Sequence, residues 1–145
     1  MAIKQSIQMT YPRFPVSGPG IGGRSIKAER GEYTAATAGT VGVGDTIELF
    51  KLHPRFRVTG GYVKTTGMGT GVTISVGDAA DPARYFAAGT AVATAGSNVT
   101  LAETGRDYIN NASRYITVIA TVAGATSNAT GTLVVVLTGY IEEPA

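Results

Sequence analysis

Short segments in which every second residue is apolar, separated by turn-forming residues, dominate the chain from residue 45 to residue 140. They are DTIELFKL (45–52), RFRVTGGYVK (55–64), GVTISV (71–76), RYFAA (84–88), NVTLAE (98–103), RYITVIATV (114–122) and TLVVVLTGY (132–140). Successive side chains of a β-strand point to opposite faces, so this period of two predicts strands. No stretch keeps a helical period over three turns. Short strands with turn signals between them are typical of an antiparallel β-sandwich or barrel.

The composition agrees with an all-β protein of one domain. Of the 145 residues, 43% are hydrophobic and only 15% are charged, against about 25% in an average protein. The 20 glycines supply turns, and Gly60-Gly61 inside a strand segment predicts a bulge or a sharp bend. The sequence contains no cysteine, which excludes disulfides and thiolate metal sites. We therefore predict an all-β, antiparallel β-sandwich.

The N-terminal region differs from the rest, because YPRFPVSGPGIGGR (11–24) is rich in Pro and Gly. Proline lacks an N–H group and fixes φ, so this stretch predicts an extended arm rather than a helix or a central strand. TAATAGTVGVG (34–44) is interpreted as a flexible connection. We assign residues 1–40 to an extended N-terminal arm with its connection, and residues 41–145 to the sandwich domain.

The predicted arm is also basic. Residues 1–30 contain five basic residues and one acidic residue, a net charge of +4, whereas the whole chain carries +2. A basic leading segment predicts contact with an acidic surface, although a solvated basic end is an equally weighted alternative. The residues predicted to bind a partner are Tyr11, Arg13, Phe14, Val16, Ile21, Arg24 and Lys27.

Two of the predicted strands are apolar on both faces. A sandwich has one interior layer, so a second apolar face needs another cover. The candidates for an interface between copies of the chain are Ile116, Val118, Val134 and Val136. This pattern predicts a homo-oligomer, and the alternative of equal weight is that the second face is covered within one chain.

The residues offer little for catalysis or cofactors. GMGTG (67–71) lacks the Lys-Ser/Thr of a phosphate loop and leads into a strand, so it predicts a turn. His53 is the single histidine, and no acid–base pair stands out. Asp78 and Asp81 could share a calcium ion, but turn capping by Asp78 is favoured. We expect no enzyme activity, cofactor, metal or nucleic-acid site. We also expect no membrane span and no secretory signal, hence synthesis in a cytoplasm.

The run from Asp45 to Phe86, with GGYVK, TISVGD and DPARY in order, resembles small β-rich virion proteins of tailed bacteriophages, and the likeness continues to TGTLVVVLTGY. It covers about residues 45–138 and does not reach the arm. The resemblance is to capsid decoration, or cement, proteins. It implies a jelly-roll-like sandwich, an oligomer, with a trimer favoured, and no enzyme activity.

The resemblance further implies binding to the major capsid protein and a place on the capsid surface of a virion assembled in the host cytoplasm. We therefore expect a protein that decorates and stabilises a capsid shell. The alternatives are a phage fibre or head–tail component, or a receptor- or glycan-binding β-sandwich. In the last case Tyr62, Tyr85 and Tyr108 could stack on a sugar ring.

Overall fold

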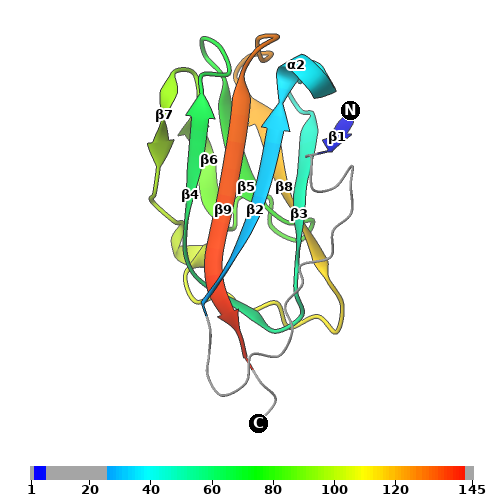
Figure 1. Cartoon of the computed structure of the whole chain (residues 1–145), viewed down its shortest axis with the longest axis vertical. Helices are drawn as coiled ribbons and strands as arrows, with labels where there is room; N and C mark the ends of the chain where they lie inside the picture. The colour runs from blue at the N-terminus through cyan, green and yellow to red at the C-terminus, as the bar shows by residue number, and fades with distance from the viewer. Residues whose placement is uncertain (1, 6–25, 143–145) are drawn as a thin grey trace.

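The computed structural model describes residues 2–5 and 26–142, which form two β-sheets stacked face to face (Figure 1). One sheet has the strand order β1-β3-β8-β5-β6 and the other β2-β9-β4-β7. The strands are β1 (Ile3–Gln5), β2 (Lys27–Thr34), β3 (Thr46–Leu52), β4 (Phe56–Thr66), β5 (Thr73–Gly77), β6 (Phe86–Ala91), β7 (Ala95–Asn98), β8 (Ile116–Ala123) and β9 (Thr132–Ile141). Helix α2 (Ala35–Ala38) and a 3₁₀ turn (Glu103–Gly105) lie between strands. The predicted all-β sandwich is confirmed.

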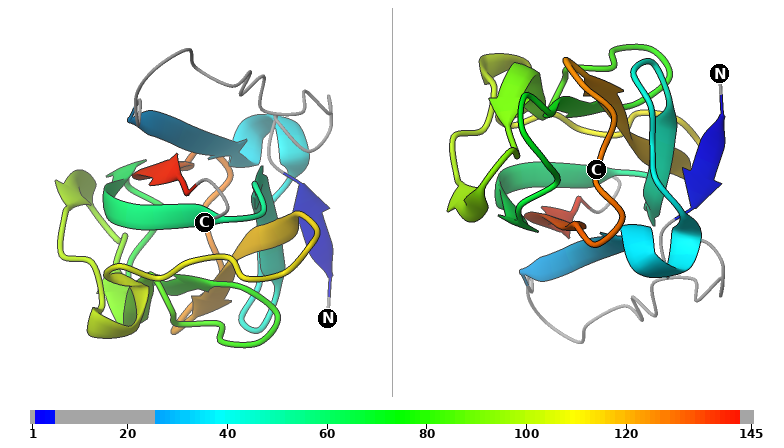
Figure 2. Two further views of the ribbon diagram at one scale, coloured as in Figure 1. Left: turned by 90° about the horizontal axis from the view of Figure 1, so that it is seen from below. Right: turned by 90° about the horizontal axis from the view of Figure 1, so that it is seen from above.

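The chain crosses from one sheet to the other at each step from β2 to β9, except between β5 and β6. The end views in Figure 2 show the two layers that result. All strand pairs are antiparallel except β1, which lies parallel to β3 at the edge of its sheet. Strands β2 to β9 are eight strands divided between the two sheets, which is the number of strands in a jelly roll.

The core lies between the sheets and consists of the alternate positions of the predicted strands. Fully buried residues of the central strands are Ile47, Leu49, Ile74, Val76, Val118, Ala120, Leu133, Val135 and Leu137. The core also contains four large aromatic side chains that are fully buried, those of Tyr33, Phe56, Tyr85 and Phe86. Burial of one such aliphatic or aromatic side chain contributes roughly 1.5–3 kcal/mol. The period of two in the sequence therefore corresponds to the inner and outer faces of real strands.

The N-terminal boundary of the sandwich differs from the prediction. Strand β2 lies within the segment assigned to the arm and connection, yet it pairs with β9 over eight positions. Tyr33 and Ala35 are buried in the core, so this part of the predicted arm and connection belongs to the sandwich. A Cβ on Gly31 would lie 2.7 Å from the Cβ of Leu49, which shows how closely β2 approaches the opposite sheet.

Two smaller predictions have opposite outcomes. The segment 98–103 does not form a strand of its own: Asn98 is the last residue of β7, and Glu103 is the first residue of the 3₁₀ turn. Gly60 marks a register shift between β4 and β9, which confirms the predicted irregularity. In GMGTG, the three glycines adopt positive φ values of 99°, 119° and 78°, and Met68 between them is fully buried. The loop is therefore a turn: its positive φ values require glycine, and the buried Met68 anchors it to the core.

Candidate functional site

A groove with a volume of about 790 Å³ lies on the outer face of the five-stranded sheet. Its floor is formed by outward residues of β3 and β8, such as Glu48, Thr117 and Ile119. Its walls are the turn after β5 and the loop before β8. The volume lies in the range of small-molecule sites, about 300–1,000 Å³. The groove is thus the first candidate for binding.

One wall of the groove is fixed by a buried ion pair. Asp78, 4% exposed, follows β5, and its Oδ1 accepts hydrogen bonds from the backbone N–H groups of Ala80 and Asp81. Arg84 Nε donates to Asp78 Oδ2 at 2.7 Å. The Arg84 guanidinium carbon lies 4.1 Å from the centre of the Tyr108 ring. Asp78 therefore caps a turn, as favoured from the sequence, and positions Tyr108 through Arg84.

The motif residues of the phage resemblance build this same wall. A Cβ on Gly77 would lie 2.0 Å from the carbonyl oxygen of Asp81, so the turn closes only with glycine there. Asp81 Oδ1 accepts a hydrogen bond from the N–H group of Ala83. These contacts explain why SVGD and DPARY occur together. In this part of the molecule the motif is structural.

The opposite wall depends on Asn110, which is fully buried. Its Nδ2 donates to the carbonyl oxygens of Leu52, His53 and Arg114 at 3.1–3.2 Å. Its Oδ1 accepts a hydrogen bond from the N–H group of Ala112. Asn110 thereby holds the loop before β8 in one conformation. The amino-acid order does not point to Asn110, because its three acceptors come from two separate parts of the chain.

The groove combines aromatic, amide and charged groups. Tyr108, Tyr115, Asn111 and Arg114 line it together. The ring of Tyr115 is held edge-to-face against His53, with centroids 5.2 Å apart. Burial raises the pKa of the Tyr108 hydroxyl, and Arg84 partly opposes this shift. The hydroxyl is therefore neutral at physiological pH and available as a hydrogen-bond donor.

Tyr85 is not available for stacking on a ligand. It is fully buried, and its hydroxyl has no hydrogen-bond partner among the described residues. Burial raises its pKa far above the usual value, and the neighbouring Asp78 adds to this effect. Tyr62, 37% exposed, lies on β4 of the other sheet. Of the three predicted stacking tyrosines, only Tyr108 lines the groove.

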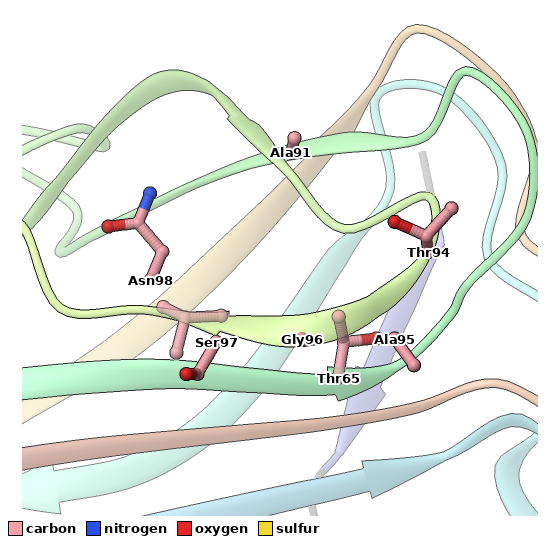
Figure 3. Close-up of a pocket in the computed structure, with 8 residues that line it drawn as sticks. Thr65, Ala91, Thr94, Ala95, Gly96, Ser97 and Asn98 are labelled. Carbon is pink, nitrogen blue, oxygen red and sulfur yellow. The ribbon is translucent and has the colours of Figure 1, made fainter.

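A smaller hollow of about 190 Å³ lies between β4 and the β6–β7 segment. Figure 3 shows its lining, which consists of small side chains such as Ala91, Thr94 and Ser97. None of its lining residues carries a charge. No group of three or more His, Cys, Asp or Glu side chains in residues 2–5 and 26–142 could hold a metal ion. Within the same residues, no helix is long and apolar enough to cross a membrane.

The four predicted interface residues do not lie on one surface. Val134 and Val136 point outward from β9, away from the core residues Leu133 and Val135. Ile116 lines the groove on the other sheet. Val118 is a core residue with no exposed surface, so its assignment to an interface is corrected. The inward direction of alternate β8 residues explains the difference.

Val134, which is half-buried, and Val136, which is only 5% exposed, lie at the centre of a mixed patch on the outer face of the four-stranded sheet. In register, Val136 lies between Arg30 of β2 and Tyr62 of β4. Val134 lies between Glu32 and Lys64, and Arg30 forms an ion pair with Glu32 at 2.8 Å. We call these six residues the β9 patch. An apolar centre with a polar rim is the usual composition of a protein interface.

Most of the predicted arm residues lie outside the described residues: Tyr11, Arg13, Phe14, Val16, Ile21 and Arg24. Lys27 is described and is the first residue of β2, in register with Gly139 of β9. Its assignment to an extended arm is therefore corrected. Strand β2, with the sequence KAERGEYT, lacks a regular apolar period, so its amino-acid order alone does not predict a strand.

No protein-family model and no curated protein matches the sequence. Two solved structures match the fold. A chain in the capsid of Ralstonia phage GP4 has a TM-score of 0.76 at 23% identity, over 99% of this chain and all of that chain. A chain in the cyanophage Pam1 capsid asymmetric unit has a TM-score of 0.64 at 22% identity, over 92% of this chain and 96% of that one. The protein thus shares its fold with chains of two phage capsid structures.

Proposed function

We propose that this protein is a non-enzymatic virion component that decorates and stabilises the capsid of a tailed phage by binding its major capsid protein. The observation that carries the proposal is the fold shared, over 99% of this chain, with a chain in the capsid of Ralstonia phage GP4. The likeness to a chain in the Pam1 capsid supports it independently. The capsid surface, assembled in the host cytoplasm, is then the place of action.

The physical properties of the sandwich suit this role. A clamp on a shell needs a rigid body, and two sheets around one apolar core provide it. Many identical copies on one particle add up by avidity, so that each contact can be weak. The β9 patch is the surface we assign to contacts between copies, with a trimer as the favoured state. The basic N-terminal segment is the part we assign to the major capsid protein.

The proposal is tested with capsids that lack the protein, to which the purified full chain is added. We expect hundreds of copies per particle, in fixed ratio to the major capsid protein, by quantitative gel analysis after sedimentation. The double variant Arg13→Glu/Arg24→Glu is expected to lose occupancy, because its affinity for the capsid falls by a factor of about ten or more. The matched control Lys51→Glu/Arg106→Glu reverses two exposed charges of the sandwich and keeps full occupancy.

Three results would contradict the proposal in different ways. A handful of copies per particle would favour a fibre or head–tail component. Full occupancy of the Arg13→Glu/Arg24→Glu variant would show that these two arginines of the N-terminal segment do not contribute to capsid binding. Absence of all binding to the capsid, with a folded protein, would overturn the proposal.

A receptor- or glycan-binding function is the second candidate, and the groove is the observation that favours it. Aromatic rings with nearby amide and charged groups are suited to sugars, because rings cover apolar sugar faces while polar groups bind hydroxyls. A glycan array with the full chain tests this function. Tyr115→Ala is expected to abolish any signal, and Tyr62→Ala on the other sheet to retain it. Absence of a binding signal on the array at high protein concentration would rule this function out.

A further inference from the structure

Strand β1 differs from the other strands in how it joins the fold. It has three residues and forms the only parallel pair among the described strands, at the edge beside β3. In Figures 1 and 2 it lies at the margin of the sandwich, at the N-terminus of the chain. No residue of the described core belongs to β1. Its attachment therefore depends on groups other than buried apolar side chains.

The groups that hold β1 are almost all backbone groups. In register, Ile3 lies opposite Thr46, and the N–H group of Thr46 donates to the carbonyl oxygen of Ala2 at 3.1 Å. The N–H group of Ala2 donates to Asp45 Oδ1 at 2.8 Å. The side chain of Ile3 is 62% exposed. Such a site accepts the same segment equally well from any copy of the chain.

The acceptor for β1 is already formed on the body of the sandwich. Asp45 Oδ2 accepts a hydrogen bond from the N–H group of Gly42 at 2.8 Å, and the carbonyl oxygen of Asp45 accepts one from Val122. Hydrogen bonds from the N–H groups of Ala2 and Gly42 lower the pKa of Asp45. The carboxylate is thus charged at neutral pH and oriented by its own loop, whichever chain supplies the strand.

The chain between β1 and β2 is long enough to reach a neighbour. Residues 6–26 separate Gln5 from Lys27, and an extended residue spans about 3.3 Å, so this segment can cover roughly 70 Å. The cost of closing a loop rises only slowly with its length. Once two copies are held side by side, docking on the same chain and docking on the adjacent copy therefore differ little in entropy, the condition under which identical elements are exchanged.

We infer that β1 is an exchanged strand: in the oligomer, Ala2–Gln5 of one copy pairs with β3 of a neighbouring copy, with Asp45 of that neighbour as the acceptor for the Ala2 N–H group. The partner is thus a second copy of this chain, bound by addition of a strand to a sheet edge. The exchange ties copies together without a large apolar interface. The exchange requires self-association but not capsid binding. Strand exchange and the proposed capsid function can therefore be tested separately.

Cross-linking tests the inference cleanly, because the chain has no cysteine. Ile3→Cys and Thr46→Cys are made in separate chains that are co-expressed, so that mixed oligomers form, and are then treated with a short bismaleimide. A link between these two positions can only join different copies. Ser97→Cys, exposed on β7 at the opposite side of the molecule, replaces Thr46→Cys in the control. We expect at least tenfold more linked dimer with Thr46→Cys than with Ser97→Cys.

The double variant Ile3→Cys/Thr46→Cys in one chain completes the design. Exchange predicts covalent oligomers from this variant at concentrations at which the protein self-associates. Links only within single chains, with no linked dimer in the mixed sample, would overturn the inference. So would a complete lack of links between the two positions, or a protein that stays monomeric. Binding of the unmodified chain to capsids is unaffected by these outcomes and tests the proposed function alone.

Discussion

Asp78 shows how much of this fold depends on one buried acid. Its carboxylate accepts two backbone hydrogen bonds and pairs with Arg84, whose side chain is 17% exposed. Asp78→Ala leaves the guanidinium without its partner and the turn without its cap. We expect a loss of about 3 kcal/mol in the free energy of unfolding, measured by urea denaturation.

The matched control for Asp78 is Glu103→Ala. Glu103 pairs with Arg106 at 3.3 Å, but its side chain is 87% exposed. An exposed pair of this kind contributes little, so the free energy of unfolding is expected to change by less than about 0.5 kcal/mol. Equal losses in the two variants would mean that the Asp78–Arg84 pair has no special role.

Glu29 gives a prediction for pH. Burial raises its pKa from 4.5 to about 7, and Lys27 opposes this rise. Because the folded-state pKa is the higher one, the folded protein binds the proton more tightly than the unfolded chain. The contribution of Glu29 to stability is therefore greatest at low pH, and it is lost as the pH rises from about 4.5 to 7. Glu29→Gln is expected to flatten that fall in thermal unfolding, and an unchanged pH profile would contradict the assignment.

At the scale of elements, β2 defines where the sandwich begins. A chain that starts at residue 26 keeps the whole strand, and we expect it to unfold cooperatively in urea. A chain that starts at residue 35 loses β2 with its fully buried Tyr33 and exposes the edge of β9. We expect this chain to be insoluble or unfolded by circular dichroism. Folding of both chains to the same stability would show that β2 is dispensable.

The sequence predicted the elements whose two faces differ in polarity. In β5, the buried Ile74 and Val76 alternate with the half-buried Thr73 and Ser75, and this contrast is visible in the amino-acid order. Strand β2 was missed because its inward positions include Glu29 and Gly31, which carry no apolar signal. Strand β7, AGSN, is an exposed edge strand of small residues. Edge strands bury little, so their sequences are weakly constrained.

Only those parts of the candidate site whose residues are close in sequence could be predicted. Asp78 and Arg84 are six residues apart, and the capping role of Asp78 was favoured from the sequence. The groove itself needs β3, the turn after β5 and the loop before β8 to meet. The hydrogen bonds of Asn110 to Leu52 and His53 span more than 50 residues. Contacts of that separation depend on the strand order, which the period of two does not encode.

At the scale of the whole molecule, the two outer sheet faces have different properties. The five-stranded sheet has a groove with aromatic, amide and charged groups, whereas the four-stranded sheet has the β9 patch with its apolar centre. A protein that contacts its own copies and a separate partner needs two such distinct surfaces. We therefore assign the face-to-face contact between copies to the β9 patch, in addition to the exchange of β1 at the edge of the other sheet, and assign the groove to a ligand.

Val134→Glu tests this division between the two faces. Val134 is half-buried at the centre of the β9 patch, and a carboxylate there would be desolvated on association. We expect the dissociation constant for self-association to rise about tenfold or more, by sedimentation velocity at micromolar concentration. Thr73→Glu is the matched control, because Thr73 is half-buried on β5 of the other sheet, two strands away from β3 and the docking site of β1. Similar effects of both variants, or a monomeric wild-type protein, would contradict the assignment of the β9 patch.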